Sequence, residues 1–230
     1  MKNLFKNIFL PLNITLILAV ILGDICYITL GGLAIKATTS VFFVLLGVVN
    51  LTYVILTKKP LAFPIIMTVG LIFAMLGDIL LNIEFIVGAL FFAVGHIWFF
   101  IAYNAIQKFR LTDLIYCLAI FIPSIIFILC MPFLDFGDLI MKIIVIFYAL
   151  IISLMVGKSI ANLVNQPTAQ NILIAIGSIL FFFSDLMLLL NVFGNLSKVF
   201  DVLCLATYYP AECILAMSIF APKDKEQANN

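Results

Sequence analysis

The chain consists of long apolar runs separated by short polar breaks, and this pattern continues along nearly its whole length. The runs are continuously apolar rather than alternating, which is typical of membrane-spanning helices and not of the strands of a membrane barrel. Each run is about 20 residues long, the length that a helix needs to cross a bilayer core. The pattern predicts an all-α membrane bundle of eight transmembrane helices, at about 8–28, 37–57, 61–81, 85–107, 112–132, 139–157, 171–191 and 199–220.

The composition supports this interpretation. Hydrophobic residues make up 66% of the chain and charged residues 10%, whereas a soluble domain is about half apolar and a quarter charged. No polar segment is long enough to fold as a separate soluble domain, and no basic block indicates a nucleic-acid partner. We therefore expect one transmembrane domain over residues 1–220 and a short polar tail over 221–230. The N-terminal run lacks a small-x-small cleavage site, which favours a retained first span over a signal peptide.

The basic residues predict the orientation. If the N-terminus is cytoplasmic, nine of the twelve lysines and arginines fall on the cytoplasmic side, namely Lys2, Lys6, Lys58, Lys59, Lys108, Arg110, Lys158, Lys223 and Lys225. The remaining three, Lys36, Lys142 and Lys198, fall on the other side. This bias follows the positive-inside rule and predicts a multi-pass protein of the cell membrane with both termini in the cytoplasm.

Two aspartates lie inside apolar runs. Asp78 lies in GLIFAMLGDILLN and Asp185 in GSILFFFSDLMLLLN, and a small residue, Gly77 or Ser184, precedes each. Small residues let two helices approach closely. A charged carboxylate at this depth costs several kcal/mol unless it is paired, so such groups usually face an interior cavity. The predicted orientation places both acids in the outer half of the membrane, where they form either a functional pair or structural ion pairs, for example with Lys36.

Other polar groups reach the same zone. His96 and Tyr103 share a helical face in VGHIWFFIAYN, and Tyr208, Tyr209 and Glu212 lie in ATYYPAECIL. His96 is the single histidine and the five cysteines form no C-x-x-C pair, so we expect buried thiols, no metal site and no cofactor. The catalytic candidates are Asp78 and Asp185, and the candidate substrate-binding residues are Lys36, Asn82, His96, Tyr103, Ser184, Tyr208, Tyr209 and Glu212.

The chain resembles the lysoplasmalogenase family, the YhhN-like membrane proteins, in four stretches. These are GDILL at 77–81, GHIWFFIAY at 95–103, SDLMLLLNVF at 184–193 and TYYPAECIL at 207–215. The resemblance implies eight transmembrane helices and hydrolysis of the vinyl ether bond of lysoplasmalogens, with a fatty aldehyde and a glycerophospho-headgroup as products. The chain departs from the family pattern at three positions: Ala37 stands where proline is usual, Phe99 where tyrosine is usual and Glu212 where glutamine is usual.

Vinyl ether hydrolysis requires a carboxylic acid that protonates carbon and a carboxylate that stabilises the resulting cation and activates water. Two carboxyls in a water-poor site divide in this way because desolvation and mutual repulsion favour a shared proton. Which aspartate is the acid stays open, because a coupled pair titrates as a unit. The expected partners are a lysophospholipid substrate and membrane lipid, with His96 and Tyr208 orienting headgroup or water and Lys36 near the phosphate. The oligomeric state is left open.

Three alternatives remain. A proton-coupled transporter of a lipid or small molecule would use the same intramembrane carboxylates as a relay. An intramembrane aspartyl protease would also need two aspartates, but its G-x-G-D signature is absent, since residues 75–78 read MLGD. A purely structural membrane protein is the third.

Overall fold

The computed structural model describes residues 5–194 and 196–220. A π-helical turn, η1 (Phe5–Phe9), leads into eight α-helices. Each is long and apolar enough to cross a membrane, which confirms the predicted all-helical bundle. The predicted polar tail lies outside the described residues. The helices are α2 (Leu10–Leu30), α3 (Leu33–Leu56), α4 (Ala62–Leu80), α5 (Phe85–Ile106), α6 (Asp113–Cys130), α7 (Leu139–Asn165), α8 (Ala169–Phe193) and α9 (Val199–Ser218).

Two predicted helix ends are wrong, and in both cases a lysine misled the prediction. Helix α7 continues to Asn165, past the predicted end at 157, because Lys158 is buried and bonds Asp113 at 2.6 Å instead of reaching water. Helix α3 begins at Leu33, so Lys36 lies in its first turn and is buried. Neither lysine belongs to a loop, but removing one from each side leaves the basic bias in the same direction.

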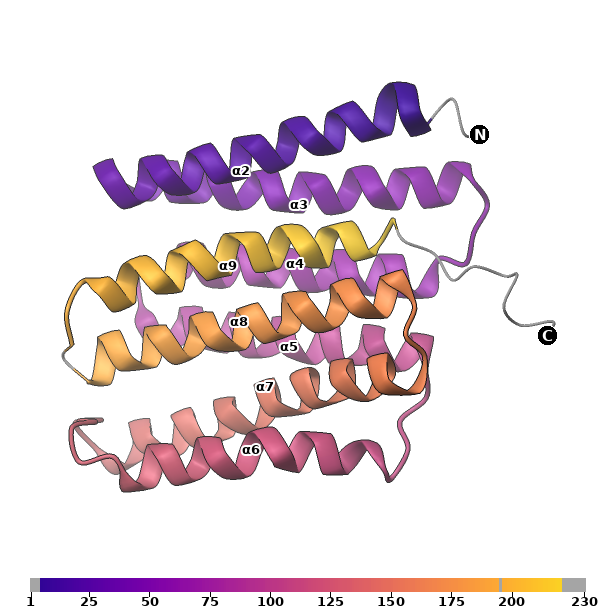
Figure 1. Ribbon diagram of the computed structural model, residues 1–230. Coiled ribbons are helices and arrows are strands. Elements are labelled where there is room, and N and C mark those ends of the chain that lie inside the picture. The colour runs from indigo at the N-terminus through magenta and orange to yellow at the C-terminus, as the bar shows by residue number, and fades with distance from the viewer. Residues whose placement is uncertain (1–4, 195, 221–230) are drawn as a thin grey trace.

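The helices form two rows that α7 closes at one end (Figure 1). One row is α2, α9 and α8, and the other is α3, α4 and α5. The backbone of α7 lies close to those of both α5 and α8, which meet each other only through side chains, and the backbone of α6 lies close to that of α7 alone among the described elements. The region between α5, α6, α7 and α8 is therefore left to side chains rather than to close helix contacts.

Small residues bring each aspartate-bearing helix close to the helix that follows it. A Cβ atom added to Gly70 of α4 would lie 2.5 Å from the Phe99 ring of α5. A Cβ atom added to Gly177 of α8 would lie 2.8 Å from the Leu215 side chain of α9. Glycine is therefore required at both crossings, as expected for tight packing of membrane helices.

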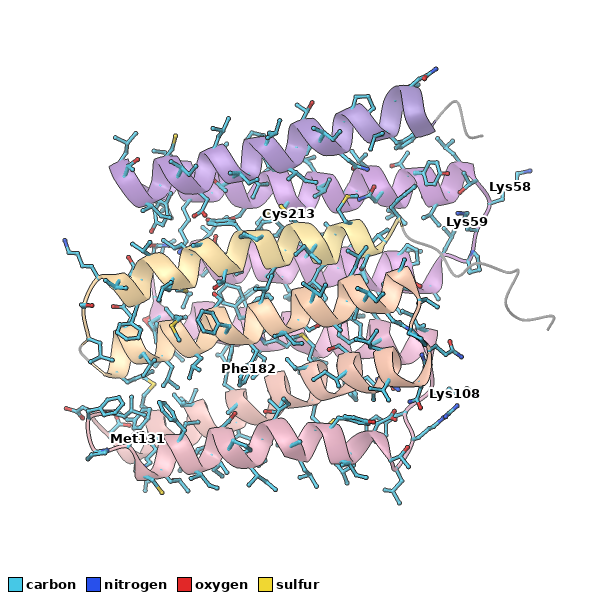
Figure 2. All side chains as sticks on the ribbon, viewed as in Figure 1. Lys58, Lys59, Lys108, Met131, Phe182 and Cys213 are labelled. Atoms are coloured by element: carbon cyan, nitrogen blue, oxygen red, sulfur yellow. The ribbon has the colours of Figure 1, made fainter. Side chains whose placement is uncertain are left out.

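Because the number of spans is even, α2 begins and α9 ends at the same end of the bundle (Figure 1). Lys58, Lys59 and Lys108 lie at this end, which we call the basic end (Figure 2). Large apolar side chains cover the outside of the bundle, for example Leu22 and Ile115, which are 61% and 67% exposed. Such a surface suits lipid rather than water.

Candidate active site

Asp78 lies near the C-terminal end of α4, away from the basic end, and is 3% exposed. Its Oδ1 atom lies 3.0 Å from Nζ of Lys36 in the first turn of α3. Its Oδ2 atom accepts hydrogen bonds from Ser40 Oγ at 2.6 Å and from Tyr209 Oη at 2.9 Å. A cation and two hydroxyl donors contact this carboxyl group, so Asp78 is held in a fixed position.

Lys36 and Asn82 extend this network toward the end of the bundle. The Lys36 ammonium lies 5.4 Å from the centroid of the Tyr27 ring, within the range of a cation–π contact. Tyr27 Oη donates to Asn82 Oδ1 at 3.1 Å, and Asn82 Nδ2 donates to the backbone carbonyl of Asp78 at 3.1 Å. Helices α2, α3 and α4 are thereby tied together around one carboxylate.

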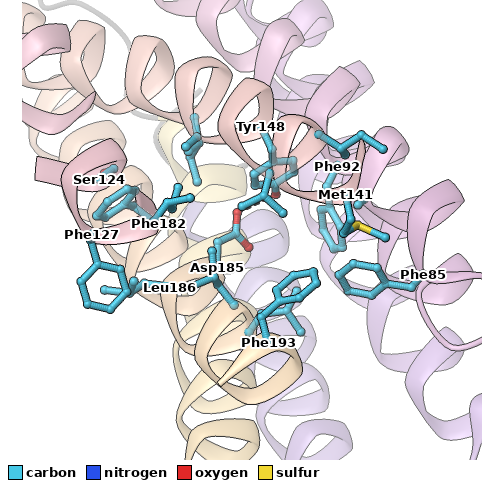
Figure 3. A pocket seen from close by; sticks show the side chains of 18 of the residues that line it. Phe85, Phe92, Ser124, Phe127, Met141, Tyr148, Phe182, Asp185, Leu186 and Phe193 are labelled. Carbon is cyan, nitrogen blue, oxygen red and sulfur yellow. Dashed lines mark hydrogen bonds between the residues drawn. The ribbon is translucent and has the colours of Figure 1, made fainter. Parts of the chain in front are cut away.

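Asp185 lies on α8 in different surroundings. Its Oδ2 atom accepts a hydrogen bond from Tyr148 Oη of α7 at 2.6 Å, and the two side chains face each other in Figure 3. Nε2 of His96, on α5, lies 3.2 Å from the same oxygen and 2.9 Å from Tyr148 Oη. The three groups link the helices α5, α7 and α8, and they add to other side-chain contacts between α5 and α8 such as that of His96 with the Phe181 ring.

The two aspartates differ in charge balance and access. Lys36 pairs with Asp78, whereas no lysine or arginine of the described chain forms an ion pair with Asp185. The Asp185 side chain is 13% exposed, compared with 4% for Asp78. All hydrogen bonds of Asp185 within the described residues involve Oδ2, which leaves Oδ1 open to a bound molecule. The arrangement provides one fixed carboxylate and one carboxyl group with a free oxygen.

Both aspartates line one cavity of about 170 Å³, which we call the polar cavity. Residues of six helices form its walls, and exposed Asp201 and Val192 mark where it meets the surface. Lys36, Asn82, Ser184 and Tyr208, which were predicted from the sequence, lie in the wall as well. The hydroxyl of Ser184 donates to the backbone carbonyl of Cys204 at 2.9 Å, so its role there includes holding α8 against α9.

The other four predicted residues do not line the polar cavity. His96 and Tyr209 lie behind the aspartates and hydrogen-bond to them. Tyr103 is fully buried and shares a hydrogen bond of 2.8 Å with Ser178. Glu212 is fully buried, and neither of its carboxyl oxygens has a hydrogen-bond partner in the described part of the chain.

Sequence reasoning missed three polar residues around the aspartates. Tyr148 and Ser40 hydrogen-bond to Asp185 and Asp78, and Asp201 lies at the edge of the polar cavity. Tyr148 is the lone hydroxyl in the apolar run IIVIFYALII, and that was the available signal. Ser40 lies one helical turn after Lys36, so a search for polar groups on the face of Lys36 would have found it.

A comparison with family models identifies this arrangement. The YhhN family model matches residues 31–219. The chain belongs to the YhhN family. The matched segment includes α4 with Asp78, α8 with Asp185 and every helix that contributes to the polar cavity except α2. No curated protein and no solved structure matches the chain. Family membership therefore rests on the sequence of the YhhN core itself.

Proposed function

We propose that this YhhN protein is a membrane hydrolase that cleaves the vinyl ether bond of lysoplasmalogens, using Asp78 and Asp185 as an intramembrane pair. The observation that carries the proposal is that both carboxyl groups line one cavity, with a single cation, Lys36, beside one of them. The cavity, of about 170 Å³, is large enough for several waters or a small polar group. The resemblance to lysoplasmalogenases supplies the substrate class.

The unequal surroundings of the two aspartates support a division of roles between them. Asp185 is the acid, because it has only neutral or histidine partners and its Oδ1 atom is free to face the substrate. It donates its proton to the vinyl carbon that is not bonded to the ether oxygen. The other vinyl carbon, which carries the oxygen, then becomes an oxocarbenium ion. Asp78, fixed by Lys36, Ser40 and Tyr209, stabilises this cation and orients the attacking water.

The remaining steps return the site to its starting state. Water adds to the oxocarbenium carbon, and this addition forms a hemiacetal. The proton that the water loses goes to the carboxylate pair. The bond between the hemiacetal carbon and the glycerol oxygen then breaks, and a proton from the pair goes to that oxygen. The hemiacetal hydroxyl gives its proton back to the pair as it becomes the aldehyde carbonyl, so the pair again holds one proton. The products are a fatty aldehyde and a glycerophospho-alcohol, and the net reaction consumes one water.

The test is aldehyde release from a lysoplasmalogen by the purified protein in detergent. Asp185→Asn keeps the shape and the hydrogen bond to Tyr148 but removes the acidic proton. We expect turnover to fall about 100-fold or more, the usual scale for a positioned proton donor. The melting temperature should change little, because the variant leaves no buried cation unpaired.

Asp78→Asn tests the second carboxyl group and requires a matched control, because Lys36 is buried and would lose its counter-charge. We expect this variant to lose both turnover and stability. Lys36→Met/Asp78→Asn should recover the melting temperature and stay inactive. Recovery of aldehyde release in the double variant would show that Asp78 is only half of a structural ion pair. Substrate flux across vesicles without any product would indicate the carrier alternative.

A further inference from the structure

A second cavity lies beside the polar one and is almost entirely apolar. It has a volume of about 300 Å³ and lies between helices α5, α6, α7 and α8. Figure 3 shows it lined by aromatic and aliphatic side chains such as Phe85, Phe127 and Phe182, with the carboxyl group of Asp185 projecting into it. We call it the apolar cavity. The reaction at the aspartates does not by itself explain what molecule occupies this cavity.

The two cavities share part of their walls. Leu81, Phe85, Phe92, Asp185 and Leu188 line both. Asp185 is the ionisable residue among these five, and Tyr148, which donates to it, lines the apolar cavity only. Asp78 lines the polar cavity only. A bound molecule that is polar at one end and apolar at the other therefore has Asp185 beside the point where its polar and apolar parts join.

The apolar cavity also has a side on which helices do not close it. Helices α6 and α8 both contribute wall residues, but their backbones do not come close, and contact across this side is made by side chains such as Phe127. The wall between them consists of side chains, among them Phe127, Phe182 and Leu186, which are all partly exposed. In a membrane this side faces lipid, so a hydrocarbon chain can pass between α6 and α8 without crossing water.

We propose that the apolar cavity binds the single hydrocarbon chain of the substrate, while the polar cavity holds the glycerol and the headgroup extends to the surface where the polar cavity opens at Asp201 and Val192. This inference rests on the proposed function. It adds where the hydrocarbon chain binds, how the substrate is oriented and why only one chain is accepted. The bond between chain and glycerol then lies at Asp185, with its chain-side carbon turned toward the apolar cavity. A cavity of about 150 Å³ holds one benzene molecule, so 300 Å³ holds roughly twelve carbons of one chain.

Two features follow from this geometry. The contacts of carbons near the glycerol are fixed, whereas carbons beyond roughly the twelfth extend between α6 and α8 into lipid. Affinity should therefore rise with chain length up to about that point and then level off. A second long chain on the glycerol would have to fit into the polar cavity, whose volume of about 170 Å³ is too small for a headgroup side and a second chain together, so a two-chain lipid is rejected.

The experiment uses the full-length protein in phosphatidylcholine vesicles. The probe is a saturated 1-alkyl-glycerophosphocholine with a photoreactive diazirine in the chain, which has no vinyl ether and cannot be cleaved. We expect the label on cavity-lining segments of α5 to α8, and we expect an excess of unlabelled single-chain lipid to compete it away. Label confined to outward-facing helices such as α2, or insensitive to the single-chain competitor, would overturn the inference.

Matched variants test the cavity itself. Ala149→Phe on α7 and Ala89→Phe on α5 fill it from two sides, and each should lower cavity labelling at least about tenfold, because the chain loses buried contacts. Ala119→Phe, on the exposed face of α6 and outside both cavities, is the control of equal size and should label normally. Unchanged labelling in the folded cavity variants would contradict the chain site. If Ala149→Phe does not fold, the labelling of Ala89→Phe decides between the two outcomes.

The labelling result and the proposed function fail separately. Cavity labelling in a wild-type protein that releases no aldehyde would contradict the hydrolase and leave the chain site in place. Aldehyde release combined with labelling that ignores both cavity variants would contradict the chain site and leave the hydrolase in place.

Discussion

Two buried acids of this protein, Asp185 and Glu212, differ in what surrounds them. Asp185 has a tyrosine and a histidine within hydrogen-bond distance and lines both cavities. Glu212 is fully buried, lines neither cavity and has no partner for either carboxyl oxygen among the described residues. A residue used in the chemistry needs access to a bound molecule, so the structure separates these two acids although both lie inside apolar helices.

Glu212→Gln is expected to leave aldehyde release unchanged and to keep or raise the melting temperature. The amide has the same shape and no acid to desolvate, and an unsatisfied buried polar group costs roughly 1–3 kcal/mol. The converse control is Gln170→Glu, because Gln170 donates from Nε2 to the Ser218 carbonyl at 3.1 Å and a carboxylate cannot donate. That variant should lower the melting temperature. A Glu212→Gln protein without activity would make Glu212 part of the mechanism.

Tyr148→Phe removes the hydroxyl between Asp185 and His96 while keeping the aromatic ring. His96 Nε2 remains 3.2 Å from Asp185, so the carboxyl group keeps one partner but loses the shorter bond. The loss of one hydrogen bond of about 1.5 kcal/mol corresponds to roughly a tenfold drop in kcat, with little change in KM. Tyr116→Phe on α6, outside both cavities, is the control and should keep wild-type kinetics. Equal kinetics for the two variants would remove Tyr148 from the site.

At the scale of helices, α6 depends on α7 for its position. Its backbone lies close to that of α7 and to that of no other described element. A buried ion pair, Asp113 with Lys158 at 2.6 Å, ties the two helices near the basic end, and Lys158 also donates to the Lys108 carbonyl at 3.3 Å. Further along, Gly157 lets the backbone of α6 approach, since an added Cβ would lie 2.5 Å from Cα of Cys117. Because α6 forms one wall of the apolar cavity, this contact also shapes the site.

Breaking the ion pair from one side should be costly. Asp113→Asn leaves the Lys158 ammonium, 1% exposed, without a counter-charge, and the expected loss is about 3–5 kcal/mol of folding free energy. Asp113→Leu/Lys158→Met removes both charges and should recover most of the melting temperature. Unfolding of the wild type and the two variants in one detergent gives the comparison. A double variant no more stable than Asp113→Asn would show that the pair is needed for more than its charge balance.

The glycine contact gives a separate test of the α6–α7 packing. In Gly157→Ala the new methyl group meets backbone atoms that cannot turn away, so we expect a loss of about 1–3 kcal/mol. Gly95→Ala is the matched control, because its Cβ would lie no closer than 3.4 Å to any neighbour and alanine favours a helix. Thermal melts should show a lower midpoint for Gly157→Ala only. Equal midpoints would mean that α6 can shift without cost.

At the scale of the molecule, the sequence predicts the spans well because the length of an apolar run is a direct response to bilayer thickness. The prediction of helix ends fails where a charged residue is paired inside the bundle. Lys158 marks the end of a helix in the apolar pattern because its partner, Asp113, is 45 residues away in the sequence. The same limit applies to the site. Asp78 and Asp185 stand out as carboxyls in lipid, whereas Tyr148 acts only through the packing of α7 against α8, which no local pattern encodes.

Orientation is the property of the whole molecule that remains a prediction. Lys58, Lys59 and Lys108 gather at the basic end, so the positive-inside rule places that end in the cytoplasm. A reporter fused to the C-terminus and one in the Lys108–Arg110 loop should both report cytoplasm, and one beside Lys198 the opposite compartment. Both aspartates lie in the half away from the basic end, so this orientation would have substrate arrive from the outer leaflet. If the Lys198 and C-terminal reporters agree, α9 does not cross the membrane; if all three invert, the substrate side inverts with them while the cavities stay as described.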